Sequence, residues 1–346
     1  MYTVAIAGAT GAVGSVMLDI LEERDFPVDT LIPLASERSR GKTVEFKGND
    51  IEVEVLSEKS FEDVDLVLSS CGSGVIVDYA DRMVDEGAVV VDNSSAYRYD
   101  PDIPLVVPEI NSHVLEDHDG LIANPNCSTT QLVMALHPLH EAFDIDRIVV
   151  STYQATSGAG SQAQEDMYEQ SQQVLDGESV EDTGEFPHQI AFNALPDIGP
   201  VLDEENDYTK EEMKMVWETR KILGDDSIDV SPTAVRIPVG VGHGETVNIE
   251  FNEPCDVGEV RERLSSFSGV EVQDSPKESV YPTMIDAEGE DPVYVGRIRK
   301  DPSLDSGINC WIVNDNLRKG AALNTIQIAE TLIEENLVQT RATAGV

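Results

Sequence analysis

The chain contains 346 residues, enough for two domains that each bury a core. It carries 66 acidic residues against 23 basic ones, and a formal net charge of -43 argues against nucleic acid as a partner because like charges repel. No apolar stretch is long enough to cross a bilayer, and the N-terminus leads directly into a strand-like segment without room for a signal peptide. We therefore expect a cytoplasmic protein without a membrane partner.

The acidic residues are spread over predicted helices and loops instead of forming a tail, and lysine is scarce. Molar salt shortens the Debye length to about 3 Å and would screen this self-repelling surface, so the composition predicts a protein of a salt-rich cytoplasm. The cysteines are far apart and form no CxxC pair, which argues against a disulfide scaffold and against a cysteine zinc site. One of them could instead be a reactive thiol.

The first third of the chain alternates short apolar strands with helices. Helices are predicted up to Glu23 and at residues 75–86, and strands at residues 4–7, 31–35, 66–70, 88–91, 105–107 and 121–123. Strands separated by helices indicate a Rossmann-like, doubly wound parallel sheet. We assign residues 1–127 to this first domain and expect the C-terminal segment 316–346 to rejoin it through a helix at residues 320–336. Residues 338–346 are expected to be loosely ordered.

After Ser128 the pattern changes to longer strands with few helical crossovers. Helices are predicted at residues 131–143, 162–175 and 209–223, and strands at residues 147–155, 234–239, 246–251, 293–298 and 310–313. This pattern favours a mixed sheet, so residues 128–315 are predicted to form a second, α+β domain.

A glycine-rich turn, with Gly8, Gly11 and Gly14, joins the first strand to the first helix. Such a turn lets the backbone approach a pyrophosphate, which then lies at the helix N-terminus, although a purely structural turn gives the same pattern. Residues 36–40 follow the second strand and contain two arginines, which can hold the 2′-phosphate of NADP. Glu37 in this segment is the acidic residue type that NAD-binding proteins use there, but the arginines favour NADP.

Cys127 lies in a polar segment directly before a helix, after the strand at residues 121–123. A helix N-terminus favours the thiolate, and its amides can stabilise an oxyanion, so Cys127 is predicted to be a nucleophile. His243 lies in a glycine-lined turn between two strands, where it could face a cleft as an acid or base, with Glu245 as a possible orienting group and Arg236 as a carboxylate ligand. A metal pair of His137 and His140 is not expected, because no third ligand is near in sequence.

Taken together, these segments resemble the aspartate-semialdehyde dehydrogenases. The matching segments run in the family's order at residues 8–14, 94–98, 124–130, 152–160, 211–214, 236–245 and 314–320. The resemblance implies reversible, NADPH-dependent reductive dephosphorylation of L-aspartyl-4-phosphate to L-aspartate 4-semialdehyde through a cysteine thioester, without a metal. It also implies a role in lysine, threonine and methionine biosynthesis, and assembly as a homodimer or homotetramer. Residues 128–315 would then be the catalytic and dimerisation domain, and residues 1–127 the NADP-binding domain.

The resemblance implies a role for each matching residue. Cys127 would be the nucleophile, His243 the acid/base, and Gln154 would orient the substrate. Arg98 and Lys214 would hold phosphate with Asn126 nearby, Arg236 would bind the substrate carboxylate, and Glu211 would contact the substrate amine or Arg236. The residues implied to bind the cofactor are Gly8, Thr10, Gly11, Ala12, Val13, Arg38, Ser39, Ser157, Gly158 and Asn316.

Two alternative functions stay open at this point. N-acetyl-γ-glutamyl-phosphate reductase shares the fold and chemistry, but its cysteine lies in a different local motif. A non-catalytic NADP-binding homologue would lack the nucleophile or the base, and both are present. A short-chain reductase is excluded because no tyrosine has a lysine four residues later.

Overall fold

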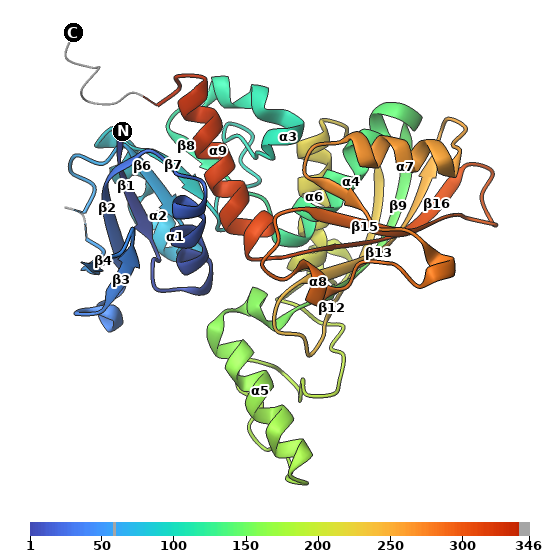
Figure 1. Cartoon of the computed structure of the whole chain (residues 1–346), viewed down its shortest axis with the longest axis horizontal. Coiled ribbons are helices and arrows are strands. Elements are labelled where there is room, and N and C mark those ends of the chain that lie inside the picture. The colour runs from blue at the N-terminus through green and yellow to red at the C-terminus, as the bar shows by residue number, and fades with distance from the viewer. Residues whose placement is uncertain (58–59, 339–346) are drawn as a thin grey trace. The chain divides into compact units, whose positions relative to one another are not determined.

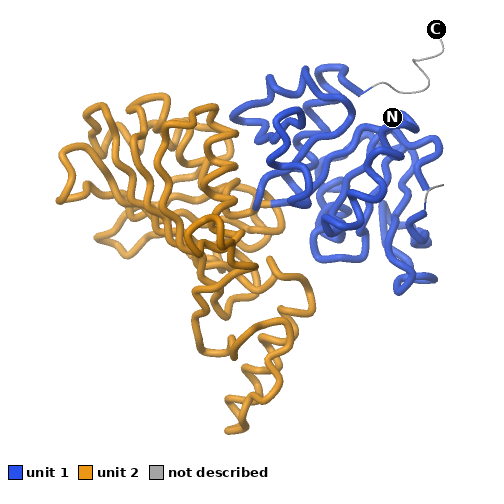
Figure 2. Tube along the Cα trace, turned by 180° about the vertical axis from the view of Figure 1, so that it is seen from behind, with its two compact units in different colours: residues 1–126, 321–346 blue, residues 127–320 orange. Residues whose placement is uncertain are grey.

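The computed structural model describes residues 1–57 and 60–338. Figure 2 shows two compact units, one formed by residues 1–126 and the chain from residue 321 onward, the other by residues 127–320. The expected boundaries, after residues 127 and 315, differ from these by a few residues. The expectation of loose order at residues 338–346 falls outside the described residues except for Val338, which is buried.

The first unit is built on a six-stranded sheet in the order β5-β2-β1-β6-β7-β8 (Figure 1). Its strands are β1 (Tyr2–Ala7), β2 (Val28–Ala35), β5 (Glu54–Val55), β6 (Leu66–Ser69), β7 (Val89–Asp92) and β8 (Leu121–Ala123). Every neighbouring pair is parallel, which confirms the predicted doubly wound sheet.

Both faces of this sheet are covered, as the continuous apolar runs in its strands require. Val4 and Ile6 of β1 face one core, which also contains residues of α1 (Ala12–Glu23) and α9 (Leu323–Glu334). Ala5 and Ala7 face the other core, which contains Ile76, Ala80 and Met83 of α2 (Ser73–Asp85). The short helix α3 (Pro108–Asn111) lies beside α9.

Two features of this unit differ from the prediction. The strand expected at residues 105–107 is a single bridge between Leu105 and Ala123, because Pro104 lacks an amide hydrogen and Pro108 already starts a helix. A hairpin of β3 (Thr43–Phe46) and β4 (Asn49–Glu52) was not predicted. Thr43 to Phe46 does alternate polar and apolar residues, with Phe46 buried, but the two strands have only four residues each and were overlooked.

The second unit contains a six-stranded mixed sheet in the order β12-β9-β13-β16-β15-β14. Its strands are β9 (Ile145–Gln154), β12 (Asp229–Arg236), β13 (His243–Phe251), β14 (Val270–Val272), β15 (Val293–Lys300) and β16 (Gly307–Asn314). The β9–β12 and β14–β15 pairs are parallel and the others antiparallel, which confirms the predicted mixed sheet. The strand predicted at residues 234–239 instead runs from Asp229 to Arg236, and it includes Pro232 because β12 is an edge strand, where proline is tolerated.

Three helices cover one face of the mixed sheet: α4 (Cys127–Phe143), α6 (Lys210–Leu223) and α7 (Val257–Ser266), of which α7 was not predicted. On β9 and β16, Tyr153 packs against Trp311 with ring centroids 5.6 Å apart. The short helix α8 (Met284–Ala287) contacts β16. A small hairpin of β10 (Val201–Leu202) and β11 (Tyr208–Thr209) precedes α6.

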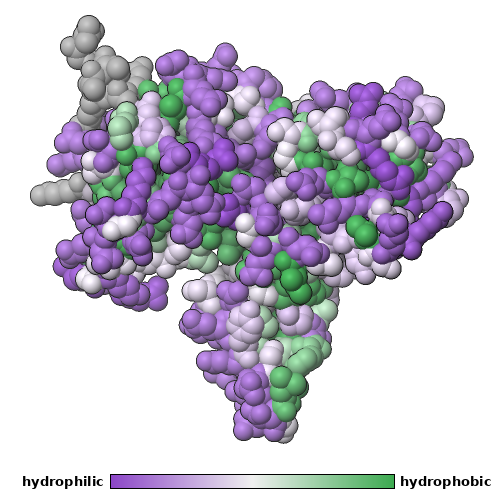
Figure 3. Space-filling view, in the orientation of Figure 1, coloured by the Kyte–Doolittle hydropathy of each residue, from purple (hydrophilic) through white to green (hydrophobic). Residues whose placement is uncertain are grey.

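Helix α5 (Ser161–Leu175) forms an arm of the second unit with a small core of its own. That core contains Ala163, Met167, Phe186, Ile190 and Leu195. Figure 3 shows apolar side chains on the surface of this arm, where Leu175 is 71% and Phe192 66% exposed. No helix in the described part of the chain has both the length and the apolar character needed to span a membrane.

Candidate active site

The predicted nucleophile, Cys127, is the first residue of α4 and is half-buried. At this position the dipole of the helix favours a negative charge on sulfur. Two other cysteines have the opposite environment, since burial raises the pKa of Cys71 to about 11 and that of Cys310 to about 12. Cys127 is therefore the thiol best placed for nucleophilic attack.

His243 begins β13 and is completely buried. Its Nδ1 accepts a hydrogen bond from the Ala155 amide at 3.0 Å, and its Nε2 has no partner among the described residues. Burial, together with the charge of Arg236, lowers the pKa of His243 to about 3. The suggestion that Glu245 orients this ring was wrong, because the Glu245 carboxylate has no hydrogen-bond partner in the described structure.

Arg236 ends β12 and is also buried. Its Nη1 donates to the Ala155 carbonyl oxygen at 2.6 Å, so the backbone of one residue holds both Arg236 and His243. Gly158 lies against both side chains, because a Cβ there would be 3.2 Å from Arg236 Nη1 and 3.3 Å from His243 Nε2. A negative charge on Cys127 favours the Arg236 cation, so the thiol and the guanidinium interact electrostatically.

A chain of polar contacts extends from this point. Thr152 donates to Gln154 Oε1 at 3.1 Å, Gln154 Nε2 donates to Glu211 Oε1 at 3.1 Å, and Lys214 Nζ donates to Glu211 Oε2 at 2.7 Å. Gln154 and Arg236 are also paired in register across β9 and β12. Glu211 and Lys214 lie in the first turn and a half of α6, which a capping box between Thr209 and Glu212 begins.

The structure thus brings six predicted residues together within the second unit: Cys127, Gln154, Glu211, Lys214, Arg236 and His243. Acyl transfer to sulfur requires a thiol and an imidazole. Binding of an anionic amino acid requires a cation for its carboxylate and charged groups such as the Glu211–Lys214 pair. The residue that sequence reasoning missed is Ala155, because a backbone contact leaves no signal in the residue type.

Ser157 and Asn316 are joined in the same unit. Asn316 Nδ2 donates to Ser157 Oγ at 3.0 Å, and Asn316 Oδ1 accepts from the Gly242 amide at 2.9 Å. The short helical turn η3 (Thr156–Ala159) is thereby tied to the turn that leads into His243. These bonds fix the backbone around Gly158, a predicted cofactor contact.

The predicted cofactor residues of the first unit surround the turn between β1 and α1. Gly8 has a φ of +92°, and a Cβ there would lie 2.6 Å from Ser70 Oγ, so the turn requires glycine. The other predicted contacts in this turn, Thr10, Gly11, Ala12 and Val13, lie at the N-terminus of α1. Thr10 Oγ1 lies 3.0 Å from Ser39 Oγ, which joins this turn to the short helix η1 (Glu37–Ser39) that holds Arg38.

Arg98 and Asn126 belong to the first unit and are both buried. Arg98 Nη2 donates to the Asn93 carbonyl oxygen at 2.6 Å. The segment that leads into Cys127 is held by Asn124, which donates to Asn93 Oδ1 at 2.9 Å and accepts from Asn324 Nδ2 at 2.7 Å. Sequence reasoning assigned no role to Asn324, although an asparagine on the buried face of an apolar helix is a detectable signal.

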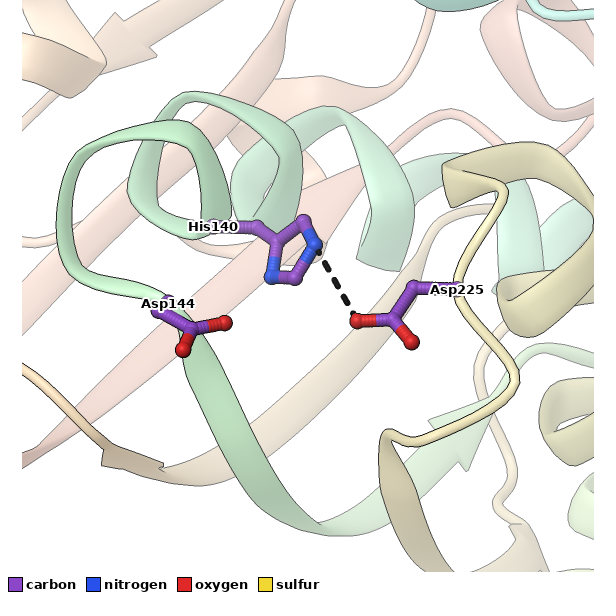
Figure 4. A group of neighbouring side chains, drawn as sticks. All are labelled: His140, Asp144 and Asp225. Carbon is purple, nitrogen blue, oxygen red and sulfur yellow. Dashed lines mark ion pairs between the residues drawn. The ribbon is translucent and has the colours of Figure 1, made fainter.

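Figure 4 shows the one group of possible metal ligands in the described part of the chain, formed by His140, Asp144 and Asp225. His140 Nδ1 accepts a hydrogen bond from the Ile145 amide at 3.1 Å, so the neutral ring carries its hydrogen on Nε2. That nitrogen faces Asp225 Oδ2 at 3.5 Å. Since a metal needs a free lone pair on the ring, this geometry indicates a histidine–carboxylate pair between α4 and the end of α6.

Family models and relatives of the same kind match this chain along nearly its whole length. Residues 3–118 match the family model described as semialdehyde dehydrogenase, NAD binding domain, and residues 136–319 match semialdehyde dehydrogenase, dimerisation domain. An aspartate-semialdehyde dehydrogenase of Aquifex aeolicus is 51% identical over 340 residues, covering 97% of this chain and 99% of that protein. One from Legionella pneumophila is 52% identical over 339 residues, covering 97% of both.

Solved structures agree with the sequence matches. A crystal structure of aspartate semialdehyde dehydrogenase II from Vibrio cholerae, complexed with ASA, is 47% identical with a TM-score of 0.93, covering 97% of this chain and 99% of that one. A structure of the Candida albicans enzyme with NADP is 27% identical with a TM-score of 0.75, covering 98% and 100%. The chain is therefore a member of the semialdehyde dehydrogenase family and belongs with its aspartate-semialdehyde dehydrogenases.

Proposed function

We propose that this chain reduces L-aspartyl-4-phosphate to L-aspartate 4-semialdehyde, reversibly, through a thioester on Cys127. The observation that carries the proposal is the group of six side chains gathered around Ala155 and Gln154 in the second unit. It contains a thiol at a helix N-terminus and charged groups suited to a small amino-acid substrate.

Each side chain has a defined task in this reaction. Arg236 binds the α-carboxylate and Glu211 the α-ammonium group, so that the side-chain carbonyl reaches Cys127. The thiolate attacks this carbonyl, and the phosphate that leaves is held by Lys214 and Arg98, with Asn126 nearby. Gln154 orients the thioester, since its amide is fixed between Thr152 and Glu211. Buried cations are needed here because the whole protein is strongly negative and would repel an anionic substrate.

A nicotinamide cofactor supplies the hydride that reduces the thioester when it is bound. The turn from Gly8 to Val13 fits a pyrophosphate, because glycine is required at its start and a helix begins after it. We propose NADP as the preferred form. Glu37, the residue that favours NAD, is paired with Arg40 at 2.6 Å, and we assign the 2′-phosphate to Arg38 and to Ser39, whose Oγ lies 3.0 Å from Thr10 Oγ1.

We further propose that the protein works as a homodimer or homotetramer in the cytoplasm, in the biosynthesis of lysine, threonine and methionine. An apolar hollow in the second unit, lined by Tyr281, Pro282, Thr283, Met284, Arg297 and Trp311, supports a contact between subunits. Beside it Ile285 is 83% exposed. Free thiols at all four cysteines fit a reducing compartment.

We also propose that the protein is adapted to a salt-rich cytoplasm. Figure 3 shows a predominantly hydrophilic surface outside the α5 arm and the region around α8, and the chain carries a net charge of -43. At ordinary ionic strength these carboxylates repel one another over about 10 Å, whereas molar salt limits the repulsion to about 3 Å.

The test is a spectrophotometric assay in molar KCl that follows reduction of NADP or NAD with L-aspartate 4-semialdehyde, with and without phosphate. We expect turnover that requires phosphate and is faster with NADP. Turnover with N-acetylglutamate semialdehyde alone would assign the chain to the related reductase. A folded protein that binds NADPH but reduces neither cofactor would contradict an enzymatic function.

A further inference from the structure

The chain after β16 returns to the nucleophile at Gly320. This glycine lies in the π-helical turn η6 (Arg318–Ala322), and a Cβ there would be 2.9 Å from Cys127 Cβ and 3.2 Å from Cys127 Cα. Both of these Cys127 atoms belong to the start of α4, so they cannot move aside as the far end of a flexible side chain could. A residue larger than glycine at position 320 would therefore displace Cys127.

The turn that contains Gly320 is fixed by its own hydrogen bonds. Asp315 is buried, and its Oδ1 accepts from the amides of Leu317 at 2.8 Å and Arg318 at 3.3 Å. The Asp315 carbonyl oxygen accepts from the Gly320 amide at 3.4 Å, which is the i to i+5 pattern of a π-helix. A clash at Gly320 would thus be relieved by movement of the nucleophile more readily than by movement of the turn.

Three asparagines hold the segment that precedes the nucleophile. Asn93 Nδ2 donates to the Ser69 carbonyl oxygen at 2.9 Å, and Asn324 Nδ2 donates to the Val106 carbonyl oxygen at 2.9 Å. Because a carbonyl oxygen only accepts, these two bonds fix the orientation of both amides. Asn124 must then donate to Asn93 Oδ1, at 2.9 Å, and accept from Asn324 Nδ2, at 2.7 Å.

The two sets of contacts come from one short stretch of chain. Asn324 follows Gly320 by four residues, in the first turn of α9, and Asn124 precedes Cys127 by three. Asn124 and Asn324 are both completely buried, so water cannot replace the bond between them. Loss of the Asn324 side chain would leave Asn124 Oδ1 without this donor.

We propose that Gly320 and Asn324 are positioning residues of the reaction. Gly320 provides the space in which Cys127 lies, and Asn324 holds the segment that leads into it. Together they determine where α4 begins, and with it the place of the thiol at the helix N-terminus. The proposal rests on the proposed thioester reaction, in which a misplacement of about 1 Å would lower the rate about 100-fold.

Alkylation of Cys127 by iodoacetamide tests this role without substrate or cofactor. Wild type, Gly320→Ala and Asn324→Ala would be alkylated in molar KCl from about pH 6 to about pH 9.5, and the Cys127 peptide analysed by mass spectrometry. Both substitutions should raise the pH midpoint of alkylation by about 0.5 pH unit, because the displaced thiolate loses part of its interaction with the dipole of α4. An unchanged midpoint in either variant, shown to be folded by calorimetry, would overturn the role of that residue.

Each substitution has a matched control. Gly74→Ala adds a Cβ where no atom lies within 4 Å, and it should leave the midpoint as in wild type. Gln327→Ala removes a hydrogen bond to Glu109 Oε1, 3.0 Å long, from the same helix as Asn324, and it should lower the melting temperature without moving the midpoint. A midpoint that rises equally in the controls would reduce the effect to general destabilisation and overturn the proposal.

The rate of thioester formation gives a second readout. With L-aspartyl-4-phosphate and no cofactor, acid-quenched samples of Gly320→Ala should acquire the aspartyl group on Cys127 about 100-fold more slowly than wild type. Wild-type rates in this variant would contradict a positioning role. A wild type that forms no thioester would refute the proposed reaction instead, and the alkylation midpoints would still decide whether Gly320 and Asn324 position the thiol.

Discussion

Ala155 shows how much of this active site depends on groups that a residue name does not reveal. Its amide donates to His243 and its carbonyl accepts from Arg236, so two reactive side chains are fixed by one backbone position. On one side of Ala155, Gln154 donates to Glu211, and on the other side Gly158 lies against the imidazole of His243. Groups fixed before the substrate binds need little reorganisation when charge develops.

Substitution of Glu211 by Gln should weaken binding of the aldehyde substrate. The substrate ammonium would lose a charged partner, so KM for L-aspartate 4-semialdehyde should rise about 10-fold or more while KM for phosphate changes little. Glu212→Gln is the matched control, because Glu212 accepts from the Thr209 amide at 2.8 Å and the Ala234 amide at 3.1 Å. It should cost about 1 to 2 kcal/mol of stability and, because it also weakens the cap of α6, raise KM much less than Glu211→Gln does. Equal KM changes in both variants would refute the assigned role of Glu211.

Glu245 provides a prediction about pH. It is fully buried without a hydrogen-bond partner in the described structure, and burial raises its pKa well above the ordinary 4.5, although Gln131 opposes this. The folded protein therefore keeps a proton that the unfolded chain releases above pH 4.5. The contribution of Glu245 to the free energy of unfolding is therefore fully present below pH 4.5. It is lost as the pH rises toward the folded-state pKa, by about 1.4 kcal/mol per pH unit.

Glu245→Gln removes this pH-dependent term. The gain in melting temperature over wild type should be smallest near pH 5 and should grow toward pH 8, measured by calorimetry at constant KCl. Glu250→Gln, half-exposed on the same strand, is the matched control and should show no such trend. A gain for Glu245→Gln that is the same at both pH values would rule out a buried neutral carboxyl group.

At the scale of elements, helix α6 and strand β13 determine which side chains meet. The capping box at Thr209 sets the first turn of α6, and with it the positions of Glu211 and Lys214. The antiparallel register pairs His243 with Asn314 and Gly244 with Tyr153, which places the imidazole beside the end of β9. A shift of one residue would turn His243 to the opposite face of the sheet.

Thr209→Ala should therefore affect both stability and substrate binding. Loss of an N-cap costs about 1 kcal/mol, and fraying of the first turn of α6 should raise KM for the aldehyde. Thr283→Ala removes the same capping box from the four-residue helix α8 and is the matched control. It should lower stability less and leave KM unchanged. Chemical denaturation and initial-rate kinetics of both variants would check this, and unchanged kinetics for Thr209→Ala would contradict it.

The sequence was sufficient to predict both sheets and the segments that carry the reactive side chains, because these depend on local pattern and on motif. It predicted the helix after Cys127 only from residue 131, whereas α4 starts at Cys127 itself. Polar residues at a helix start have no apolar periodicity, so the pattern cannot show them. The Ala155–His243 and Asn124–Asn324 contacts depend on long-range register and packing, which no local pattern contains.

At the scale of the whole molecule, charge is the dominant feature. The described ion pairs include Arg24–Glu330 at 2.7 Å and Arg261–Asp274 at 2.7 Å, but 23 basic residues cannot neutralise 66 acidic ones. Most carboxylates therefore face other carboxylates through solvent. The proposed adaptation to salt follows from this imbalance, because dissolved ions screen the repulsion between carboxylates.

The melting temperature should rise steeply as KCl increases from about 0.1 M to about 1 M, because the Debye length falls from about 10 Å to about 3 Å. Sucrose is the control, since it stabilises compact proteins by exclusion without screening charge. Its effect at matched osmolality should be smaller. A melting temperature that does not respond to KCl, or responds equally to sucrose, would contradict adaptation to salt.

The most direct test of the central claim is to trap the thioester on Cys127. Purified protein without cofactor would be mixed with L-aspartyl-4-phosphate in molar KCl, quenched in acid and examined by intact and peptide mass spectrometry. The proposed reaction predicts one aspartyl group on the peptide that contains Cys127, and none in Cys127→Ser, while Cys255→Ser retains the adduct. An unmodified Cys127 in folded protein, or an adduct on another residue, would contradict catalysis through this thiol.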